Sequence, residues 1–177
     1  MRHALTWTTL AVALVGSPAL ADAPNVPTPP PYIVLADNID EPNGYGFCLD
    51  TKGRGQGELM HSHSCKPDRG ENSYDVRFRF DTATGQIQSN TYAGQCVQVL
   101  RSGRSSEFAL LPCSEAPGQK FTTGDGDGTI RLASDAESCM IVAPNTRPAG
   151  PWVARDLQLA SCAETEDIRK RWTIVAE

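Results

Sequence analysis

The sequence of 177 residues lacks the motifs of several large protein classes. It contains neither a G-x-x-x-x-G-K phosphate loop nor a G-x-G-x-x-G fingerprint, so nothing in it supports nucleotide chemistry. The 16 Lys and Arg against 21 Asp and Glu give a net charge of −5, which argues against nucleic acid as a partner, because phosphate binding needs clustered positive charge. No apolar run approaches the ~20 residues of a membrane-spanning helix, so no membrane span is expected.

Residues suited to catalysis are also scarce. After His3, only His61 and His63 remain to serve in a Ser-His-Asp arrangement. Neither a G-x-S-x-G elbow nor an H-E-x-x-H motif is present. The carboxylates between Glu164 and Asp167 lie in a polar stretch typical of solvated surface. We therefore expect a protein that is not an enzyme and that carries no cofactor.

The first 21 residues have the pattern of a secretory signal. Arg2 and His3 form a short basic start, residues 10–15 are apolar, and Ala19 and Ala21 are the small residues that signal peptidase recognises. We expect cleavage after Ala21 and a secreted or periplasmic protein. A membrane anchor is the weaker interpretation, since the apolar run is short.

A proline-rich lead follows at residues 22–31. Five prolines in these ten residues exclude a helix or an interior strand, so an extended, solvated segment is expected. Residues 32–177 then have the size of a single domain.

The six cysteines lie in this domain. An even count in an exported chain predicts three disulfides, although six cysteines allow 15 pairings. Consecutive cysteines lie 17, 17 and 23 positions apart in three pairs: Cys48 and Cys65, Cys96 and Cys113, Cys139 and Cys162.

The amino-acid sequence around each cysteine pair repeats. Ile39, Ile87 and Ile130 each lie nine positions before the first cysteine of a pair. Each unit ends in a strand-like segment with an aromatic residue, and the units cover about residues 32–80, 81–124 and 125–177. Units this small cannot bury an apolar face alone, so we expect three of them to share one core.

The local patterns predict an all-β fold. Val76, Phe78 and Phe80 alternate with polar residues, and turn residues recur about every 8–12 positions. The best helical candidate runs from Glu164 to Lys170, with Thr165 as a possible cap, and is at most a turn or two. A closed barrel suits so many short strands, because closure removes unpaired edges.

Cys48-Leu49-Asp50, the second cysteine seventeen positions on, Gln119-Lys120-Phe121 and the Asp-Gly-x-Ile that ends at Ile130 resemble the repeat of the ricin-type β-trefoil lectins. The resemblance covers about residues 32–177. It implies a β-trefoil of three pseudo-symmetric repeats, each closed by its own disulfide: Cys48–Cys65, Cys96–Cys113 and Cys139–Cys162.

The resemblance also implies a sugar site in the first repeat. Asp50 corresponds to the acid that accepts hydrogen bonds from sugar hydroxyls, and His61 and His63 correspond to the polar and aromatic residues of a shallow pocket. Asn72 corresponds to the residue that orients the acid. In the other repeats Gln98 and Ile141 replace the acid. Asp50 as a turn residue of a degenerate repeat remains an alternative of comparable weight.

Three further motifs have structural interpretations that we prefer. His61, His63 and Cys65 share a strand face, but a disulfide at Cys65 leaves two nitrogens, too few for zinc. The Asp- and Gly-rich stretch 125–128 lacks the Glu of a calcium loop and predicts a tight turn. Gln119 is expected to make a structural hydrogen bond.

The sequence therefore predicts a secreted, non-catalytic module that binds carbohydrate through its first repeat. Two alternatives stay open. One is a protein-interaction module such as a protease inhibitor. The other is the binding subunit of a bacterial exotoxin complex, with a second secreted protein as partner.

Overall fold

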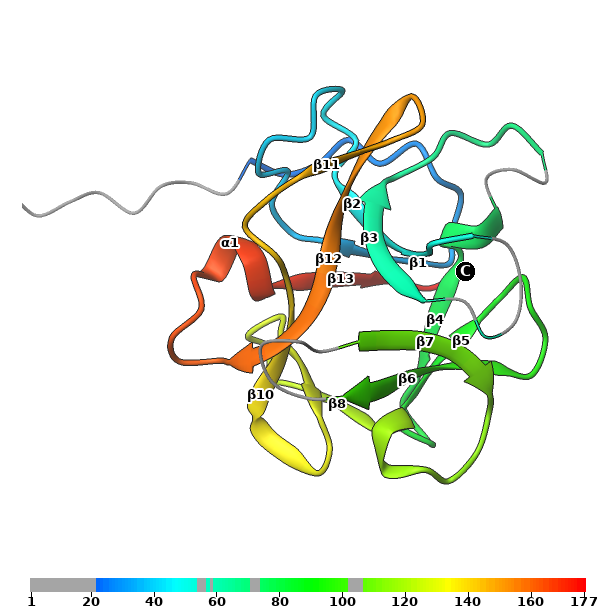
Figure 1. Cartoon of the computed structure of the whole chain (residues 1–177), viewed down its shortest axis with the longest axis vertical. Helices are drawn as coiled ribbons and strands as arrows, with labels where there is room; N and C mark the ends of the chain where they lie inside the picture. The colour runs from blue at the N-terminus through cyan, green and yellow to red at the C-terminus, as the bar shows by residue number, and fades with distance from the viewer. Residues whose placement is uncertain (1–21, 54–56, 58, 71–73, 102–106) are drawn as a thin grey trace, which may run out of the picture.

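The computed structural model describes residues 22–53, 57, 59–70, 74–101 and 107–177, and these form a molecule built almost wholly of short β-strands (Figure 1). The first repeat contains β1 (Tyr32–Leu35), β2 (Phe47–Thr51), β3 (Met60–Ser64), the 3-10 turn η1 (Tyr74–Val76) and β4 (Phe78–Asp81). The second contains β5 (Gln86–Ser89), β6 (Gln95–Arg101), β7 (Glu107–Pro112), the 3-10 turn η2 (Pro117–Gln119) and β8 (Phe121–Thr123). The third contains β9 (Ile130–Leu132), β10 (Asp135–Val142), β11 (Arg147–Ala149), β12 (Trp152–Ser161), the helical turn α1 (Asp167–Lys170) and β13 (Trp172–Val175).

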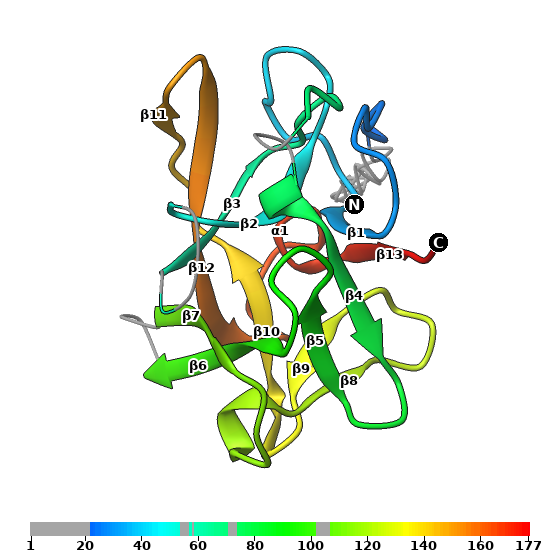
Figure 2. The ribbon, with the colours of Figure 1, turned by 90° about the vertical axis from the view of Figure 1, so that its right-hand side faces the viewer.

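Equivalent strand pairs in the three repeats give the molecule its pseudo-threefold symmetry (Figures 1 and 2). The antiparallel pairs β2–β3, β6–β7 and β10–β12 form one hairpin per repeat. The pairs β4–β5, β8–β9 and β13–β1 join each repeat to the next, so the last strand returns to the first. The paired strands form two sheets, one in the order β13-β1-β2-β3-β12-β10-β9-β8 with β11 on β12, and one in the order β4-β5-β6-β7. The expected all-β β-trefoil is confirmed.

Each hairpin is closed by its own disulfide. The bonds are Cys48–Cys65, Cys96–Cys113 and Cys139–Cys162, as the resemblance implied. A crosslink around a loop of 17 residues contributes up to about 3 kcal/mol by restricting the unfolded chain.

One hydrophobic core is shared by all three repeats. The aromatic residues that begin β4, β8 and β13 are buried at corresponding positions: Phe78, Phe121 and Trp172. Residues of all three hairpins pack into the same cluster. A smaller cluster of Val34, Cys48, Cys65 and Val76 lies within the first repeat, but the main core is shared, as expected for units this small.

The repeat register differs from the sequence-based expectation at one position. Ile33, Ile87 and Ile130 each lie next to the residue that pairs with the first cysteine of their repeat, and each is at most 1% exposed. Ile39 was expected to match Ile87 and Ile130, and this is wrong. The connection between β1 and β2 is longer than its counterparts, and Ile39 lies in it with a φ of 53°.

The proline-rich lead is extended, but it lies against the first repeat rather than in solvent. Asn25 donates its backbone N–H to Gly44 O at 2.7 Å, and the Arg77 guanidinium donates to Pro30 O at 2.6 Å. Thr28 is 4% exposed, and its hydroxyl donates to Lys66 O at 2.8 Å. These hydrogen bonds hold the lead against the first repeat, in part at the segment that follows the first hairpin.

The expected C-terminal helix is a single turn, α1. Thr165 does not cap it, because its hydroxyl donates to Ser161 O at 2.8 Å and the N-cap position belongs to Glu166. Within the described parts of the chain, no helix is long and apolar enough to cross a membrane.

Candidate functional site

The first hairpin brings three of the sequence-predicted site residues together. In the β2–β3 register Asp50 lies opposite His61, and Cys48 lies opposite His63. Because side chains alternate along a strand, these four share one face, and the opposite face packs into the core. Asn72, the fourth expected residue, lies outside the described residues.

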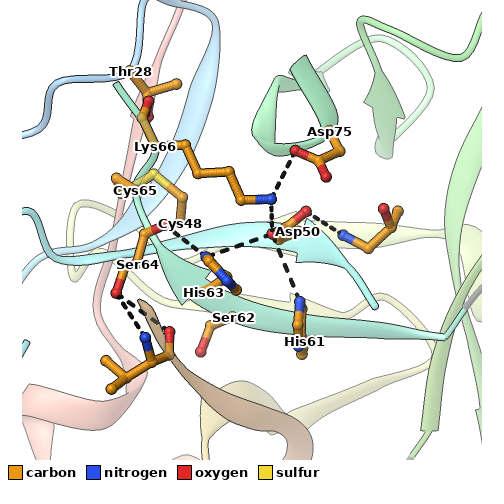
Figure 3. A network of polar contacts seen from close by, with 12 residues as sticks. Thr28, Cys48, Asp50, His61, Ser62, His63, Ser64, Cys65, Lys66 and Asp75 are labelled. Atoms are coloured by element: carbon orange, nitrogen blue, oxygen red, sulfur yellow. Dashed lines mark hydrogen bonds and ion pairs between the residues drawn. A yellow bond between two sulfur atoms is a disulfide. The ribbon is translucent and has the colours of Figure 1, made fainter. Parts of the chain in front are cut away.

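Asp50 is enclosed beneath Lys66 (Figure 3). Its side chain has no exposed area, and Lys66 Nζ lies 2.8 Å from its Oδ2. Asp50 Oδ1 accepts the Thr51 backbone N–H at 2.7 Å. Lys66 also contacts Asp75 Oδ1 at 2.9 Å, so one ammonium group serves two carboxylates. A sugar hydroxyl therefore reaches Asp50 only if Lys66 moves.

The charges of this cluster shift one another's pKa values. Burial raises the pKa of Asp50, but the contacts with His61, Lys66 and His63 outweigh it, so the pKa lies below its ordinary value. Burial lowers the pKa of Lys66, and the attraction of the two carboxylates outweighs that, so the pKa is raised. Burial and the nearby Asp50 charge raise the pKa of Asp75 despite its contact with Lys66.

The hydrogen-bond partners of the two imidazoles assign their tautomers. The Arg147 guanidinium can only donate, and it lies 2.6 Å from His61 Nδ1, so the hydrogen of this ring is on Nε2, which faces Asp50 Oδ2 at 3.6 Å. His63 Nδ1 lies 2.8 Å from Ser64 O, so it carries the hydrogen and leaves Nε2 an acceptor. Burial lowers the pKa of His63, and the attraction of Asp50 only partly offsets this.

A pocket of about 600 Å³ opens over this cluster. Its lining comes from the first and the third repeats. The lining residues used below are Asp50, Lys52, His61, His63, Lys66 and Asp75 from the first repeat, and Arg147 and Trp152 from the third. The Trp152 ring packs against Tyr45 with the ring centroids 5.9 Å apart.

Five of these residues were missed by the sequence analysis: Lys52, Lys66, Asp75, Arg147 and Trp152. The available signal for the last two was the Cys139–Cys162 spacing of 23 against 17 in the other repeats, which indicates an enlarged third hairpin. Lys66 directly follows Cys65, but its position in sequence does not indicate where its ammonium group lies.

The equivalent positions of the other repeats offer no carboxylate. Gln98 accepts a hydrogen bond from Gln119 Nε2 at 3.0 Å, and Ile141 is 2% exposed in the core of its hairpin. Gln119 also accepts the Ser114 backbone N–H at 2.7 Å, so its expected structural role is confirmed.

The Asp- and Gly-rich stretch is the expected turn between β8 and β9. The Asp127 carboxylate accepts the Thr129 backbone N–H at 2.7 Å and the Thr129 hydroxyl at 2.6 Å. It is also paired with Arg131. Across the residues that the structure describes, no group of three or more His, Cys, Asp or Glu side chains is placed to hold a metal ion.

Comparison with known proteins gives matches among solved structures only. No family model matches the sequence, and no curated protein matches it. The C-half of the earthworm R-type lectin, in complex with GalNAc, is similar with a TM-score of 0.59 and 14% identity, over 84% of this chain and 100% of that one. The β-trefoil lectin of the Vibrio vulnificus hemolysin/cytolysin, with N-acetyl-D-lactosamine bound, has a TM-score of 0.55 and 14% identity, over 82% and 93%.

A third similar structure is the mdaA-1 domain in solution, with a TM-score of 0.60 and 16% identity, over 91% of this chain and 98% of that one. At these identities the similarity establishes the fold and leaves the ligand open. The chain has the β-trefoil fold of the ricin B-like and R-type lectin domains.

Proposed function

We propose that the protein is a secreted carbohydrate-binding module and that its sugar site is the pocket over the first hairpin. The observation that carries the proposal is the convergence of Asp50, His61 and His63 at the floor of a pocket of about 600 Å³. Its support from similar structures is that the earthworm lectin was crystallised with GalNAc and the Vibrio lectin with N-acetyl-D-lactosamine.

In this proposal Asp50 acts from beneath the sugar. Its carboxylate is fully buried, whereas the Lys66 side chain is 14% exposed. An ammonium group has three hydrogens, and two are directed to Asp50 and Asp75. The third is then available to a sugar oxygen, so Asp50 orients the donor that the ligand contacts.

The acceptor in this proposal is His63 Nε2, which the tautomer leaves without a hydrogen. His61 is instead engaged by Arg147 and helps to fix that guanidinium. Asn72 precedes η1, the turn that carries Asp75, and its role in orienting the acid stays a prediction.

The export part of the proposal is supported by residues 1–21 and by the three disulfides, which persist in oxidising compartments. Mass spectrometry of the protein recovered from outside the cytoplasm should give a chain that begins at Asp22. Retention of residues 1–21 would contradict the proposed cleavage.

The experiment for sugar binding is a glycan array with the exported protein, its Asp50→Asn variant and an Asp125→Asn control in the exposed β8–β9 turn. We expect binding by the wild type and the control, and at least about tenfold weaker binding by Asp50→Asn, because Lys66 loses a charged partner. Thermal unfolding of each variant tests whether the fold is intact.

Two outcomes would contradict the proposal. Wild-type protein that binds no glycan but forms a stable complex with a second secreted protein contradicts the proposal in favour of an interaction module. Glycan binding that Asp50→Asn leaves unchanged contradicts the proposed site.

A further inference from the structure

The third repeat extends over the first. Its disulfide encloses 23 residues where the other two enclose 17, and the added length includes β11, which pairs with the first part of β12. The opposite edge of β12 pairs with β3, with Ala154 opposite His63 and Asp156 opposite His61. The β11–β12 hairpin therefore stands beside β3, as Figures 1 and 2 show, and it contributes Arg147 and Trp152 to the lining of the predicted sugar pocket.

The exposed charges that line this pocket are positive, although the whole chain is acidic. The side chains of Lys52 and Arg147 are 38% and 40% exposed, and Lys66 is 14% exposed. The two carboxylates in the lining are Asp50, with no exposed side-chain area, and Asp75, with 9%. A ligand that enters the pocket thus meets cations first.

Arg147 is the best placed of these cations. One amino group of its guanidinium donates to His61 Nδ1 at 2.6 Å, and this hydrogen bond fixes the orientation of the planar guanidinium. Its Nε lies 3.5 Å from Asp156 Oδ1, and Asp156 is shared with Lys52 at 3.2 Å. At the mouth two cations face one half-exposed carboxylate, whereas the carboxylates of Asp50 and Asp75, which together outnumber Lys66, lie buried below.

We propose that this pocket selects acidic saccharides, and that Arg147 of the third-repeat hairpin determines this specificity by binding the sugar carboxylate. A planar guanidinium held at one end presents its remaining N–H groups to a carboxylate in charge-assisted hydrogen bonds. Lys52 adds a second positive charge, and the Trp152 ring, held by Tyr45, offers an apolar face to the sugar ring. The inference rests on the proposed function and deepens it.

The test compares acidic saccharides with neutral counterparts. The probes are 6′-sialyllactose beside lactose and trigalacturonic acid beside galactotriose, titrated calorimetrically at about 20 mM and about 500 mM salt. We expect the acidic member of at least one pair to bind about tenfold more tightly at low salt, and this advantage to shrink at high salt.

Variants separate the inference from the proposed function. Arg147→Gln should reduce the acidic-to-neutral affinity ratio towards one by weakening the binding of the acidic saccharides most. Arg101→Gln is the matched control, because Arg101 is a surface arginine on β6 that is paired with Glu107 and 66% exposed. This control should keep the wild-type ratio.

Each other outcome is decisive. Neutral sugars that bind as tightly as acidic ones overturn the inference and leave the carbohydrate module standing. An acidic preference that survives Arg147→Gln overturns the assignment to this residue. Failure to bind any sugar, here and on the array, overturns the proposed function itself.

Discussion

Lys66 Nζ lies 2.8 Å from Asp50 Oδ2, and the lysine covers a carboxylate that has no exposed area of its own (Figure 3). The same ammonium is 2.9 Å from Asp75 Oδ1. One cation therefore contacts two buried carboxylates in the lining of the pocket. This arrangement makes the stability of the first repeat depend on the residue that we expect to contact the ligand.

Replacing Lys66 by Met should destabilise the protein strongly. Lys66→Met keeps most of the side-chain volume but leaves Asp50 buried without its cation, and breaking a buried pair in this way costs about 3–5 kcal/mol. The measurement is the free energy of unfolding from urea titration at neutral pH.

The double variant Asp50→Asn with Lys66→Met provides the control. Since it removes both charges, it should recover more than half of the loss. A loss below about 1 kcal/mol for Lys66→Met alone would show that the pair behaves as a solvent-exposed one.

Stability should fall as the pH drops below neutral, because of His63. The pKa of this imidazole is lowered in the folded protein, chiefly by burial, from its ordinary value of 6.5. The unfolded chain then binds the proton more readily, so the contribution of His63 is complete above 6.5 and is lost as the pH falls through the folded pKa. One such group gives a slope of at most about 1.4 kcal/mol per pH unit.

His63→Gln should flatten this dependence. Urea unfolding at about pH 7, 6 and 5 gives the slope for the wild type and the variant. Asp50 does not confound the comparison, because its lowered pKa confines its own loss of stability to pH values below 3.8. Equal slopes in both proteins would exclude His63 as the cause.

The cysteine spacing predicted most of the fold because each disulfide closes a local hairpin. Two cysteines 17 positions apart on paired strands need no long-range information. The shared strand face of His61 and His63 also follows from local alternation, and their pairing with the Cys48–Asp50 strand follows from the hairpin.

The rest of the site depends on contacts between distant segments. Arg147 meets His61 only because β12 pairs with β3, and the two residues are 86 positions apart. The burial of Asp50 depends on the direction in which the Lys66 side chain points, and no periodicity in the sequence specifies that direction. The wrong match of Ile39 has a similar origin. Counting back from a cysteine finds the matching isoleucine only if the connections have equal lengths, and the connection in the first repeat is longer.

Two of the three disulfides should be reduced in a fixed order under native conditions, Cys96–Cys113 before Cys48–Cys65. Exchange requires access of the attacking thiolate to a sulfur atom. Cys48 and Cys65 both have no exposed area, whereas Cys113 is exposed at the end of its hairpin. Limiting reductant followed by alkylation and peptide mapping should label Cys96 and Cys113 before Cys48 and Cys65. Labelling of Cys48 first would imply that the first hairpin opens locally, at the floor of the pocket.

The contact between β8 and the turn that joins β4 to β5 can be tested at Gly85, which lies in that turn. Its φ is 69°, and a Cβ added there would lie 2.9 Å from the Phe121 carbonyl oxygen. Gly94 has a similar φ of 73°, but an added Cβ would meet no atom within 4 Å. Ala at Gly94 therefore carries only the cost of the left-handed backbone, about 1 kcal/mol.

Gly85→Ala adds a displacement of β8 to that cost, because the crowded atom belongs to the backbone. The Phe121 N–H also donates to Gly85 O at 2.7 Å, so any shift strains the hydrogen bond that joins β8 to this turn. We expect a loss of about 2–4 kcal/mol for Gly85→Ala against about 1 kcal/mol for Gly94→Ala, measured by urea unfolding. Equal losses would mean that the backbone at Phe121 yields freely, which is incompatible with a tightly packed core shared by the repeats.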